Sequence, residues 1–376
     1  MSKYRFDQIA INSTAKKKPT EEDKCHYIGL EHIDSQNLIV SRWGSEIAPK
    51  GEKLLMKKGD VLFGKRRAYQ KKVAIAPFDG IFSAHGMVLR PNEEVVDKDF
   101  FPMFISSDYF LDAAIAISVG SLSPTINWKD LARLEFDLPP REEQRKLAEV
   151  LWSINDTLQA YQELLIQTDE LIKSQFIEQF GNTDNVPNGW EKTTIGQACK
   201  LVNGRAFKPS DWTKEGTPIV RIQNLNDPMA EFNYCTGDIE KKFWIDTGSL
   251  LFAWSGTPGT SFGAFIWNGG KAVLNQHIFQ VYPKDNISKP FLKYSFDGHI
   301  DEIMEKAHGG VGLRHITKRE LEKIQLLIPS RGIQDRFVAF AFQNENAKSA
   351  LQNTITSLQA TKRRILENAL RTGRKE

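Results

Sequence analysis

The sequence contains little cysteine: there are 3 among 376 residues, and Cys25, Cys199 and Cys235 lie far apart. An odd number of widely spaced cysteines excludes a disulfide-stabilised scaffold and a Cys-x-x-Cys zinc site, and it is typical of a reducing cytosol. Long apolar runs are also missing, since the longest, residues 111–119, is about half of what a membrane span needs. The first residues lack the apolar core of a signal peptide. We therefore expect a cytoplasmic protein without a membrane anchor.

The chain also has little net charge, +3, with 40% apolar and 26% charged residues. This composition is that of an ordinary globular protein, and the length predicts two or three domains. Two segments depart from the balance. Residues 141–180 carry four basic and eight acidic side chains, whereas residues 331–376 carry nine basic and four acidic ones. These opposite charges favour a pairing of the two segments.

One half of the sequence repeats in the other half. Residues 59–63 (Gly-Asp-Val-Leu-Phe) match residues 248–252 (Gly-Ser-Leu-Leu-Phe), and residues 85–91 match residues 277–283. The shift between the copies stays between 189 and 192 residues. A period this long is not that of a solenoid, so it indicates a duplicated module.

Each copy ends in a long helix. Residues 141–180 contain neither glycine nor proline, and 40 residues would make a helix of about 60 Å. A heptad seam runs along each segment. The residues predicted to pack are Leu147, Leu151, Ile154, Leu158, Tyr161 and Leu165 in the first helix and Phe337, Ala341, Leu351, Ile355, Leu358 and Ile365 in the second. Asn344, Lys348 and Lys362 occupy seam positions of the second helix and weaken its packing.

Such a helix is longer than a domain of this size is wide, about 30–35 Å, so we expect the two helices to pack on each other. Since no linker can run back along them, they should be antiparallel, forming a coiled coil between two α+β domains with approximate two-fold symmetry. The alternative is two ordinary surface helices. The predicted domains are residues 1–140 and 181–330, and the predicted helices are residues 141–180 and 331–376. Within the domains we expect strands at 73–75, 87–89, 250–254, 263–267 and 278–281 and helices at 100–116 and 291–307.

Motifs that suggest catalysis are incomplete. Residues 59–65 have the Gly-x4-Gly-Lys spacing of a phosphate-binding loop, but Arg66 stands where that loop needs Ser or Thr. Residues 137–141 lack the aromatic side chain of an amino-methyltransferase motif. Cys25, His26 and His32 have no second ligand pair at zinc spacing. We therefore expect no catalytic residue and no metal in this chain, although an unrecognised enzyme remains an alternative.

Basic and polar clusters favour contact with nucleic acid, because arginine and lysine bind phosphates and Arg, Asn and Gln read base edges. The alternative for each cluster is a solvated surface. Four surfaces are candidates. The first follows residue 63 and its repeat, the second precedes Ile126 and Ile316, and the others lie in the second domain. Their residues are Lys65, Arg66, Arg67, Tyr69, Lys71, Trp254, Ser255 and Thr257; Ser123, Thr125, Arg314 and His315; Arg205 and Lys208; and Arg221 and Asn224.

Several stretches carry a family resemblance. Residues 138–148 read Leu-Pro-Pro-Arg-Glu-Glu-Gln-Arg-Lys-Leu-Ala, residues 188–190 read Asn-Gly-Trp, and residues 216–221 read Gly-Thr-Pro-Ile-Val-Arg. With the duplicated plan, they make the chain resemble the specificity subunits of type I restriction–modification systems over essentially its whole length. It departs from the family at residues 1–10, which lack a Gly-Trp opening, and at residues 329–334, which keep one proline.

The resemblance implies that each globular part is a target recognition domain, reading one half of an asymmetric bipartite site in double-stranded DNA, and that the helices set the gap. It also implies two docked methyltransferase subunits and a motor-nuclease subunit, which hold the catalysis and use S-adenosylmethionine, ATP and Mg²⁺; this chain would hold no cofactor. A free-standing duplicated DNA-binding protein is the alternative. Exposed apolar residues on the helices would favour the subunit; the candidates are Trp152, Leu164, Ile166, Leu171, Phe340, Phe342 and Leu366.

Overall fold

The computed structural model describes residues 1–227, 230–257, 260–310 and 313–371, with all side chains except that of Arg371. The chain forms two compact units, which are described separately below. Unit 1 consists of Met1–Gln162 and the chain from Asn353 on, and unit 2 consists of Glu163–Gln352. Each unit therefore contains one globular part and one segment of each long helix.

Unit 1 is an α+β structure with two four-stranded sheets. One sheet has the order β2-β9-β6-β7 and is antiparallel throughout; the other has the order β3-β5-β8-β4, in which β4 is parallel to β8. A ribbon of β1 and β10 leads into α5. The elements are β1 (Ser2–Arg5), α1 (Phe6–Ile9), β2 (Ala10–Ser13), β3 (Lys16–Lys17), β4 (Tyr27–Ile28), β5 (Lys53–Met56), β6 (Val61–Gly64), β7 (Val73–Ile75), β8 (Gly80–Phe82), β9 (Gly86–Pro91), α2 (Phe101–Ile105), α3 (Asp108–Ala116), α4 (Trp128–Leu131), β10 (Glu135–Leu138) and α5 (Arg141–Phe180).

Unit 2 repeats this plan. Its sheets have the orders β12-β20-β16-β18 and β14-β13-β19-β15, with β13 parallel to β19, and the ribbon is β11 with β23. The elements are β11 (Glu191–Thr194), α6 (Ile195–Ala198), β12 (Cys199–Asn203), β13 (Thr217–Val220), α7 (Ile222–Asn226), β14 (Asn233–Cys235), β15 (Trp244–Ile245), β16 (Leu250–Ala253), β17 (Ser255–Gly256), β18 (Gly263–Ile266), β19 (Ala272–Leu274), β20 (Ile278–Pro283), α8 (Lys289–Gly298), α9 (Ile300–Glu305), β21 (His308–Gly310), β22 (Leu313–His315), α10 (Lys318–Leu321), β23 (Gln325–Ile328) and α11 (Arg331–Arg371).

The repeated sequence motif forms the same central strand in both units. Gly59 and Gly248 precede the strand with φ of 90° and 82°, a left-handed conformation that favours glycine. In unit 1, Val61 and Phe63 face one buried cluster and Leu62 faces another, because successive side chains of a strand alternate between its faces. Both faces of the strand are therefore covered, which explains its unbroken apolar sequence.

The duplication is not complete at the sheet edges. Strands β5, β8 and β4 of unit 1 correspond to β15, β19 and β13 of unit 2, and each trio has the same order. The fourth strand lies on opposite edges: β3 pairs with β5 in unit 1, whereas β14 pairs with β13 in unit 2. The two units thus share a core and differ at its periphery.

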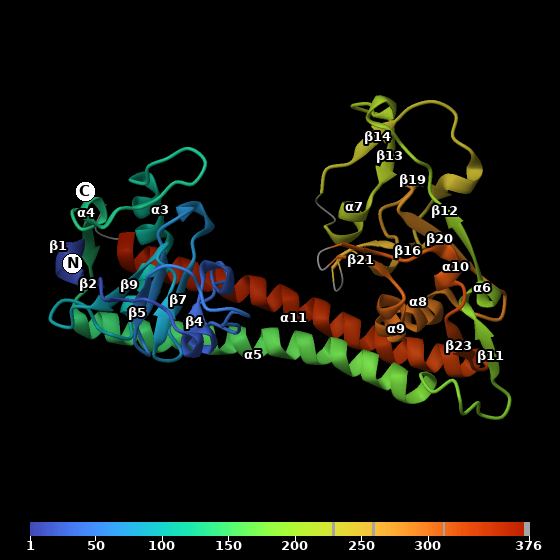
Figure 1. Cartoon of the computed structure of the whole chain (residues 1–376), viewed down its shortest axis with the longest axis horizontal. Coiled ribbons are helices and arrows are strands. Elements are labelled where there is room, and N and C mark those ends of the chain that lie inside the picture. Colours follow the sequence, from blue (N-terminus) through green and yellow to red (C-terminus); the bar gives the residue numbers. More distant parts are fainter. Residues whose placement is uncertain (228–229, 258–259, 311–312, 372–376) are drawn as a thin grey trace. The chain divides into compact units, whose positions relative to one another are not determined.

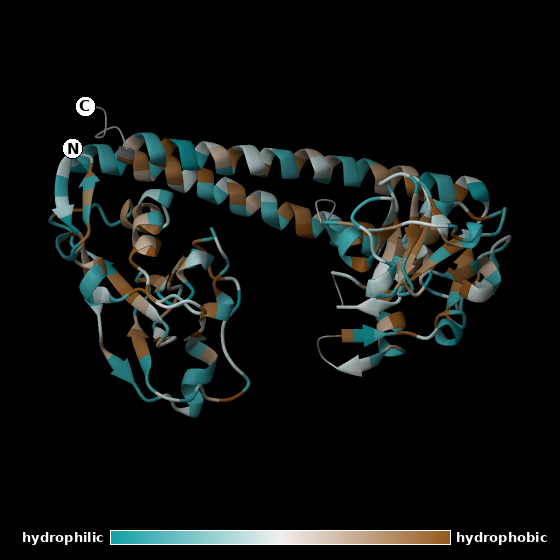
Figure 2. Cartoon of the chain, turned by 90° about the horizontal axis from the view of Figure 1, so that it is seen from above, coloured by the Kyte–Doolittle hydropathy of each residue, from teal (hydrophilic) through white to brown (hydrophobic). Residues whose placement is uncertain are grey.

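Within each unit, segments of α5 and α11 lie side by side (Figure 1). In unit 2 the Lys348 ammonium pairs with Asp169, and the rings of Phe176 and Phe337 are 5.4 Å apart, so the helices run antiparallel. In unit 1 the Lys362 Nζ donates to Asn155 Oδ1 at 2.8 Å. Figure 2 shows apolar residues interspersed with polar ones along both helices. All the residues predicted to pack along the seam are buried or half-buried.

A glutamine fixes the start of each long helix to its unit. Gln144 Oε1 accepts from the backbone N–H of Asp97 at 2.8 Å, and its Nε2 donates to the carbonyl of Pro139. Gln334 makes the corresponding bonds with the N–H of Ser288 and the carbonyl of Pro329. Both side chains are buried, at 1% and 0% exposure. Because buried backbone groups need partners, this pair explains why glutamine recurs in the repeat.

Two predicted helices are each broken into two. The expected helix at 100–116 is α2 followed by α3, because the Ser106 hydroxyl donates to the carbonyl of Met103 and the Ser107 side chain caps α3 by accepting from the N–H of Phe110. The expected helix at 291–307 is α8 followed by α9, with His299 between them. Serine favours helix starts over helix interiors, so the first break follows from residue type.

We expect Lys362 to make the stability of unit 1 depend on pH. Its half-buried ammonium has a pKa lowered to about 8 by desolvation, whereas an unfolded lysine titrates near pH 10.4. The unfolded chain thus binds more protons between these values, so the free energy of unfolding rises as pH increases from about 8 to about 10. Replacing Lys362 with Met should remove this rise and increase the free energy of unfolding at pH 7 by about 1–3 kcal/mol.

Denaturant unfolding of the two proteins at both ends of this pH window measures the effect. Lys348→Met is the matched control, because that seam lysine is paired with Asp169, and its replacement should not stabilise the chain. An equal pH slope in Lys362→Met and the unchanged chain would contradict the assignment.

Candidate nucleic-acid interface

In unit 1 the basic cluster forms a tight turn after β6. A 3-10 turn at Ala68–Gln70 is flanked by Arg67 and Lys71, both in the left-handed conformation, with φ of 54° and 48°. The N–H of Gly64 donates to the carbonyl of Lys72 and closes the base of the turn. Ala68 is buried beneath it. The turn is therefore anchored from below, whereas Arg66, Arg67 and Tyr69 are exposed.

The second predicted surface lies against this turn. The N–H of Arg67 donates to the carbonyl of Pro124 at 2.8 Å, and the N–H of Ile126 donates to the carbonyl of Lys65 at 2.9 Å. Arg66 and Thr125 form an antiparallel bridge between the two segments. Two surfaces that the sequence predicts separately are thus one surface, on which Ser123 and Thr125 are half-buried.

His85 belongs to this surface and was missed by the sequence prediction. Its Nε2 is 3.3 Å from Arg66 Nη1, and its side chain is exposed. Desolvation and the neighbouring cations Arg66, Lys65 and Lys53 lower the pKa of His85, which favours the neutral imidazole beside the Arg66 guanidinium. The repeat contained the signal, since residues 85–91 match residues 277–283.

Two predicted DNA-contact residues of unit 1, Lys65 and Lys71, are partly buried. The Lys71 ammonium is already paired within unit 1, with Asp108 at 2.7 Å and Asp112 at 2.8 Å, and its role as a DNA contact stays a prediction. The half-buried Lys65 has a lowered pKa, mainly through desolvation. The exposed cations of this surface are therefore Arg66 and Arg67.

Unit 2 brings the corresponding segments together in a small sheet. Ser255 and Gly256 of β17 pair with His315 and Arg314 of β22, and the N–H of Ile316 donates to the carbonyl of Trp254 at 3.0 Å. His315 and Thr257 are exposed, and Ser255 is half-buried. The place where these two segments meet, called the joint below, thus exposes Arg66 and Arg67 in unit 1 and Thr257 and His315 in unit 2.

Trp254 and Arg314 are held by neighbours rather than free. The Trp254 Nε1 donates to Asn203 Oδ1 at 3.1 Å and to the carbonyl of Gln276 at 3.2 Å, and its ring packs on His277 and Phe279. The Arg314 Nη1 donates to the carbonyl of Met304 at 3.0 Å. Both side chains are half-buried and support the surface from below.

The remaining candidates in unit 2 differ among themselves. Lys208 is exposed, and the half-buried Arg205 guanidinium stacks over Phe207 at 5.1 Å. The half-buried Arg221 stacks over Trp212 and donates to Asn233 Oδ1.

Asn224 is poorly placed for the predicted base contact, because only 4% of it is exposed and its amide is already hydrogen-bonded within unit 2. Its Oδ1 accepts from the N–H of Arg221, and its Nδ2 donates to the carbonyls of Ala230 and Glu231. This side chain stabilises the turn after β13 instead of facing a ligand.

In the described part of the chain, the side chains that could bind a metal ion lie apart. Among the described residues, no three His, Cys, Asp or Glu side chains lie close enough to hold a metal ion. Cys199 and Cys235 are buried, and burial raises the pKa of the Cys199 thiol to about 12.

None of the helices in the described part of the chain has the length and apolar character needed to cross a membrane.

The fold defines a duplicated α+β protein in which the same joint of each unit presents different polar side chains. The family model for the type I restriction modification DNA specificity domain matches residues 7–167 and 187–359, so the chain belongs to this family. The expected family membership and two-domain α+β fold are confirmed.

Individual relatives agree with the family. The chain is 29% identical over 160 residues to the type I restriction enzyme EcoDI specificity subunit of Escherichia coli, a match that covers 41% of this chain and only 35% of that subunit. It is 25% identical over 374 residues to the HindI specificity subunit of Haemophilus influenzae, covering 76% and 80% of the two chains. Among solved structures, a chain of a type I restriction–modification system shares the fold with a TM-score of 0.61 at 20% identity, covering 98% of this chain and 97% of that one.

Proposed function

We propose that this chain reads an asymmetric, bipartite site in double-stranded DNA, with one unit for each half-site, while partner subunits perform the chemistry. The observation that carries the proposal is the joint built alike in both units. Arg66 bridges to Thr125 in unit 1 and Ser255 bridges to His315 in unit 2, at corresponding positions of the repeat. Two different half-sites require recognition surfaces that lie at the same place in each unit but carry different side chains.

The chemistry of each joint suits this role. The exposed Arg66 and Arg67 can bind phosphates or read guanine, and the Ser and Thr hydroxyls and the imidazole of His315 can donate to or accept from base edges. Binding through two linked units would multiply their separate affinities, because the second contact forms within the same complex. The long helices would set the distance between the half-sites.

Exposed apolar side chains on the helices favour a subunit over a free-standing DNA-binding protein. In unit 2, Ile166 and Phe342 are each 60% exposed, and Leu164, Leu171 and Ile177 are exposed as well. Three residues that the sequence predicts to be exposed are not fully exposed. Leu366 is buried in the core of unit 1, and Trp152 and Phe340 are half-buried. We propose that these exposed apolar groups belong to a protein-binding surface. We assign it to methyltransferase subunits, which would hold S-adenosylmethionine; a motor-nuclease subunit would use ATP and Mg²⁺.

Replacing both Ile166 and Phe342 with Ser should therefore release the methyltransferase subunit and leave the fold intact, because both side chains are exposed. Affinity capture of the methyltransferase by the tagged chain measures the effect. Ile47→Ser is the matched control, since Ile47 is 68% exposed but lies outside the helices. If the double variant and the control captured equal amounts, the docking surface would lie elsewhere.

Selection from a random DNA library tests the proposed function directly. The purified chain with its methyltransferase partner should enrich two short, different sequence elements separated by a gap of fixed length and no fixed sequence. The free-standing alternative predicts the same enrichment from the chain alone. Enrichment of one continuous element, or of none, would overturn the proposal of one half-site per unit.

A further inference from the structure

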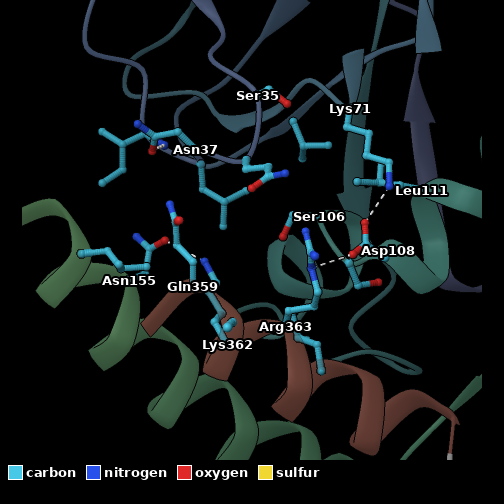
Figure 3. Close-up of a pocket in the computed structure, with 18 of the residues that line it drawn as sticks. Ser35, Asn37, Lys71, Ser106, Asp108, Leu111, Asn155, Gln359, Lys362 and Arg363 are labelled. Carbon is cyan, nitrogen blue, oxygen red and sulfur yellow. Dashed lines mark hydrogen bonds and ion pairs between the residues drawn. The ribbon is translucent and has the colours of Figure 1, made fainter. Parts of the chain in front are cut away.

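Unit 1 contains a cavity of about 370 Å³ that the DNA-contact proposal does not use. The loop around Asn37 and the start of α3 form one wall, and α5 and α11 form the other. Figure 3 shows Ser35 and Asn37 facing Asn155, Gln359 and Lys362 across the space. Its volume is at the lower end of the range of about 300–1,000 Å³ seen for small-molecule sites.

One cation of the cavity wall has no counter-charge. Asp108 pairs with both Lys71 and Arg363, the latter at 3.0 Å, so these two cations are neutralised together with Asp112. Lys362 differs, because its ammonium contacts the neutral Asn155 Oδ1 and, among the described residues, forms no ion pair. A half-buried ammonium without a carboxylate is costly, and an anion would relieve that cost.

Hydrogen-bond donors surround this ammonium. The Asn37 Oδ1 is used by the N–H of Ile39, which leaves its Nδ2, and the Gln359 amide likewise has no partner among the described residues. Ser35 adds a hydroxyl, and Leu38, Val73, Leu111 and Leu158 supply an apolar floor. A lysine charge with amide and hydroxyl donors suits phosphate oxygens, and the apolar floor suits an organic body.

The backbone of the cavity wall is strained. Three non-glycine residues of the described chain have φ in the left-handed region, and two of them, Gln36 at 64° and Lys71 at 48°, line this cavity. Such conformations cost about 1–3 kcal/mol each and persist where the surroundings hold them, commonly at ligand sites. The strain thus occurs at the same place as the unpaired cation.

We propose that this cavity binds a small organic phosphate monoester, with its phosphate at Lys362 and its organic part between Leu158 and the loop at Asn37. The site does not depend on DNA binding, so either proposal can fail without the other. Two classes of compound share this chemistry, sugar phosphates and nucleotides, and the titration described next distinguishes them.

Isothermal titration of the full chain with AMP, ribose 5-phosphate and inorganic phosphate tests the proposal. One organic phosphate should bind at a single site at least about tenfold more tightly than inorganic phosphate, and which one does so identifies the class. Lys362→Met should weaken that binding by at least about tenfold. Lys348→Met, the paired seam lysine in unit 2, should leave it unchanged.

A second readout distinguishes direct contact from a general structural effect. Since the pKa of Lys362 is about 8, binding of a phosphate near this pH should raise it and take up protons, so the observed heat should depend on the ionisation enthalpy of the buffer. The charged groups that share the wall are Lys71, Asp108, Arg363 and Glu367. Absence of binding at millimolar ligand, equal binding by Lys362→Met, or inorganic phosphate binding as tightly as both esters would each overturn the proposal.

Discussion

Removing one heptad from both long helices together should shorten the gap between the two half-sites by about three base pairs. Seven helical residues correspond to about 10.5 Å, and DNA rises about 3.4 Å per base pair. The bases that are read should stay the same, because neither recognition surface is altered. The expected change in gap follows from the proposed role of the helices as a ruler.

The contacts within each unit define which heptads to remove. Asn155 contacts Lys362 in unit 1, and Asp169 contacts Lys348 in unit 2, so in both units the two residue numbers sum to the same value. Residues 159–165 of α5 therefore match residues 352–358 of α11. Deleting only one of these segments should disrupt the seam and abolish specific binding, which provides the control.

Selection from DNA libraries with every gap length measures this effect. Removing three base pairs also turns the half-sites by about 100° around the DNA, so we expect lower affinity at the new optimum than in the unchanged chain. An unchanged gap with unchanged half-sites would mean that the helices do not set the distance.

The second large effect is expected at the turn of unit 1. Replacing Arg66 and Arg67 with Ala should weaken DNA binding and reduce its dependence on salt, because each phosphate contact contributes about 0.9 to the salt slope. The backbone of the turn is held through Ala68 and the carbonyl of Pro124, so the fold should survive. Fluorescence anisotropy at several salt concentrations measures both quantities.

The chain offers two controls for this experiment. Lys72→Ala removes a charge beside the turn whose Nζ donates to the carbonyl of Leu30 rather than facing solvent. Lys208→Ala removes one exposed charge in unit 2, which should lower the salt slope by about 0.9, half the effect of the double arginine change, if it contacts phosphate. A salt slope unaltered by the double arginine change would remove this turn from the interface.

The long helices could be predicted from the sequence because their signals are local. Residues 141–180 lack glycine and proline, and α5 spans Arg141–Phe180 in the structure. The heptad spacing likewise picks out buried positions of the two helices, including Leu151 and Phe337, which are 0% and 3% exposed. Helical periodicity involves residues that are close together in the sequence, so it can be recognised without knowledge of the tertiary structure.

The candidate site was harder to predict because the burial and pairing of its side chains depend on residues that are far apart in the sequence. Lys71 resembles its neighbours in sequence, yet its carboxylate partners Asp108 and Asp112 lie 37 and 41 residues away. Asn224 has a residue type that suits adenine, but the turn after β13 uses its whole amide. Conversely, the bridge between Arg66 and Thr125 makes one surface of two that the sequence predicts separately. Because these residues are far apart in the sequence, no local sequence pattern reveals the bridge.

Methylome sequencing of cells that carry the chain with its methyltransferase partner tests the central claim most directly. The change is to replace residues 191–328, the globular part of unit 2 from β11 to β23, with the corresponding part of a relative. We predict that one half of the methylated site changes while the other half and the gap are retained. A change in both halves, or in neither, would contradict independent recognition by the two units.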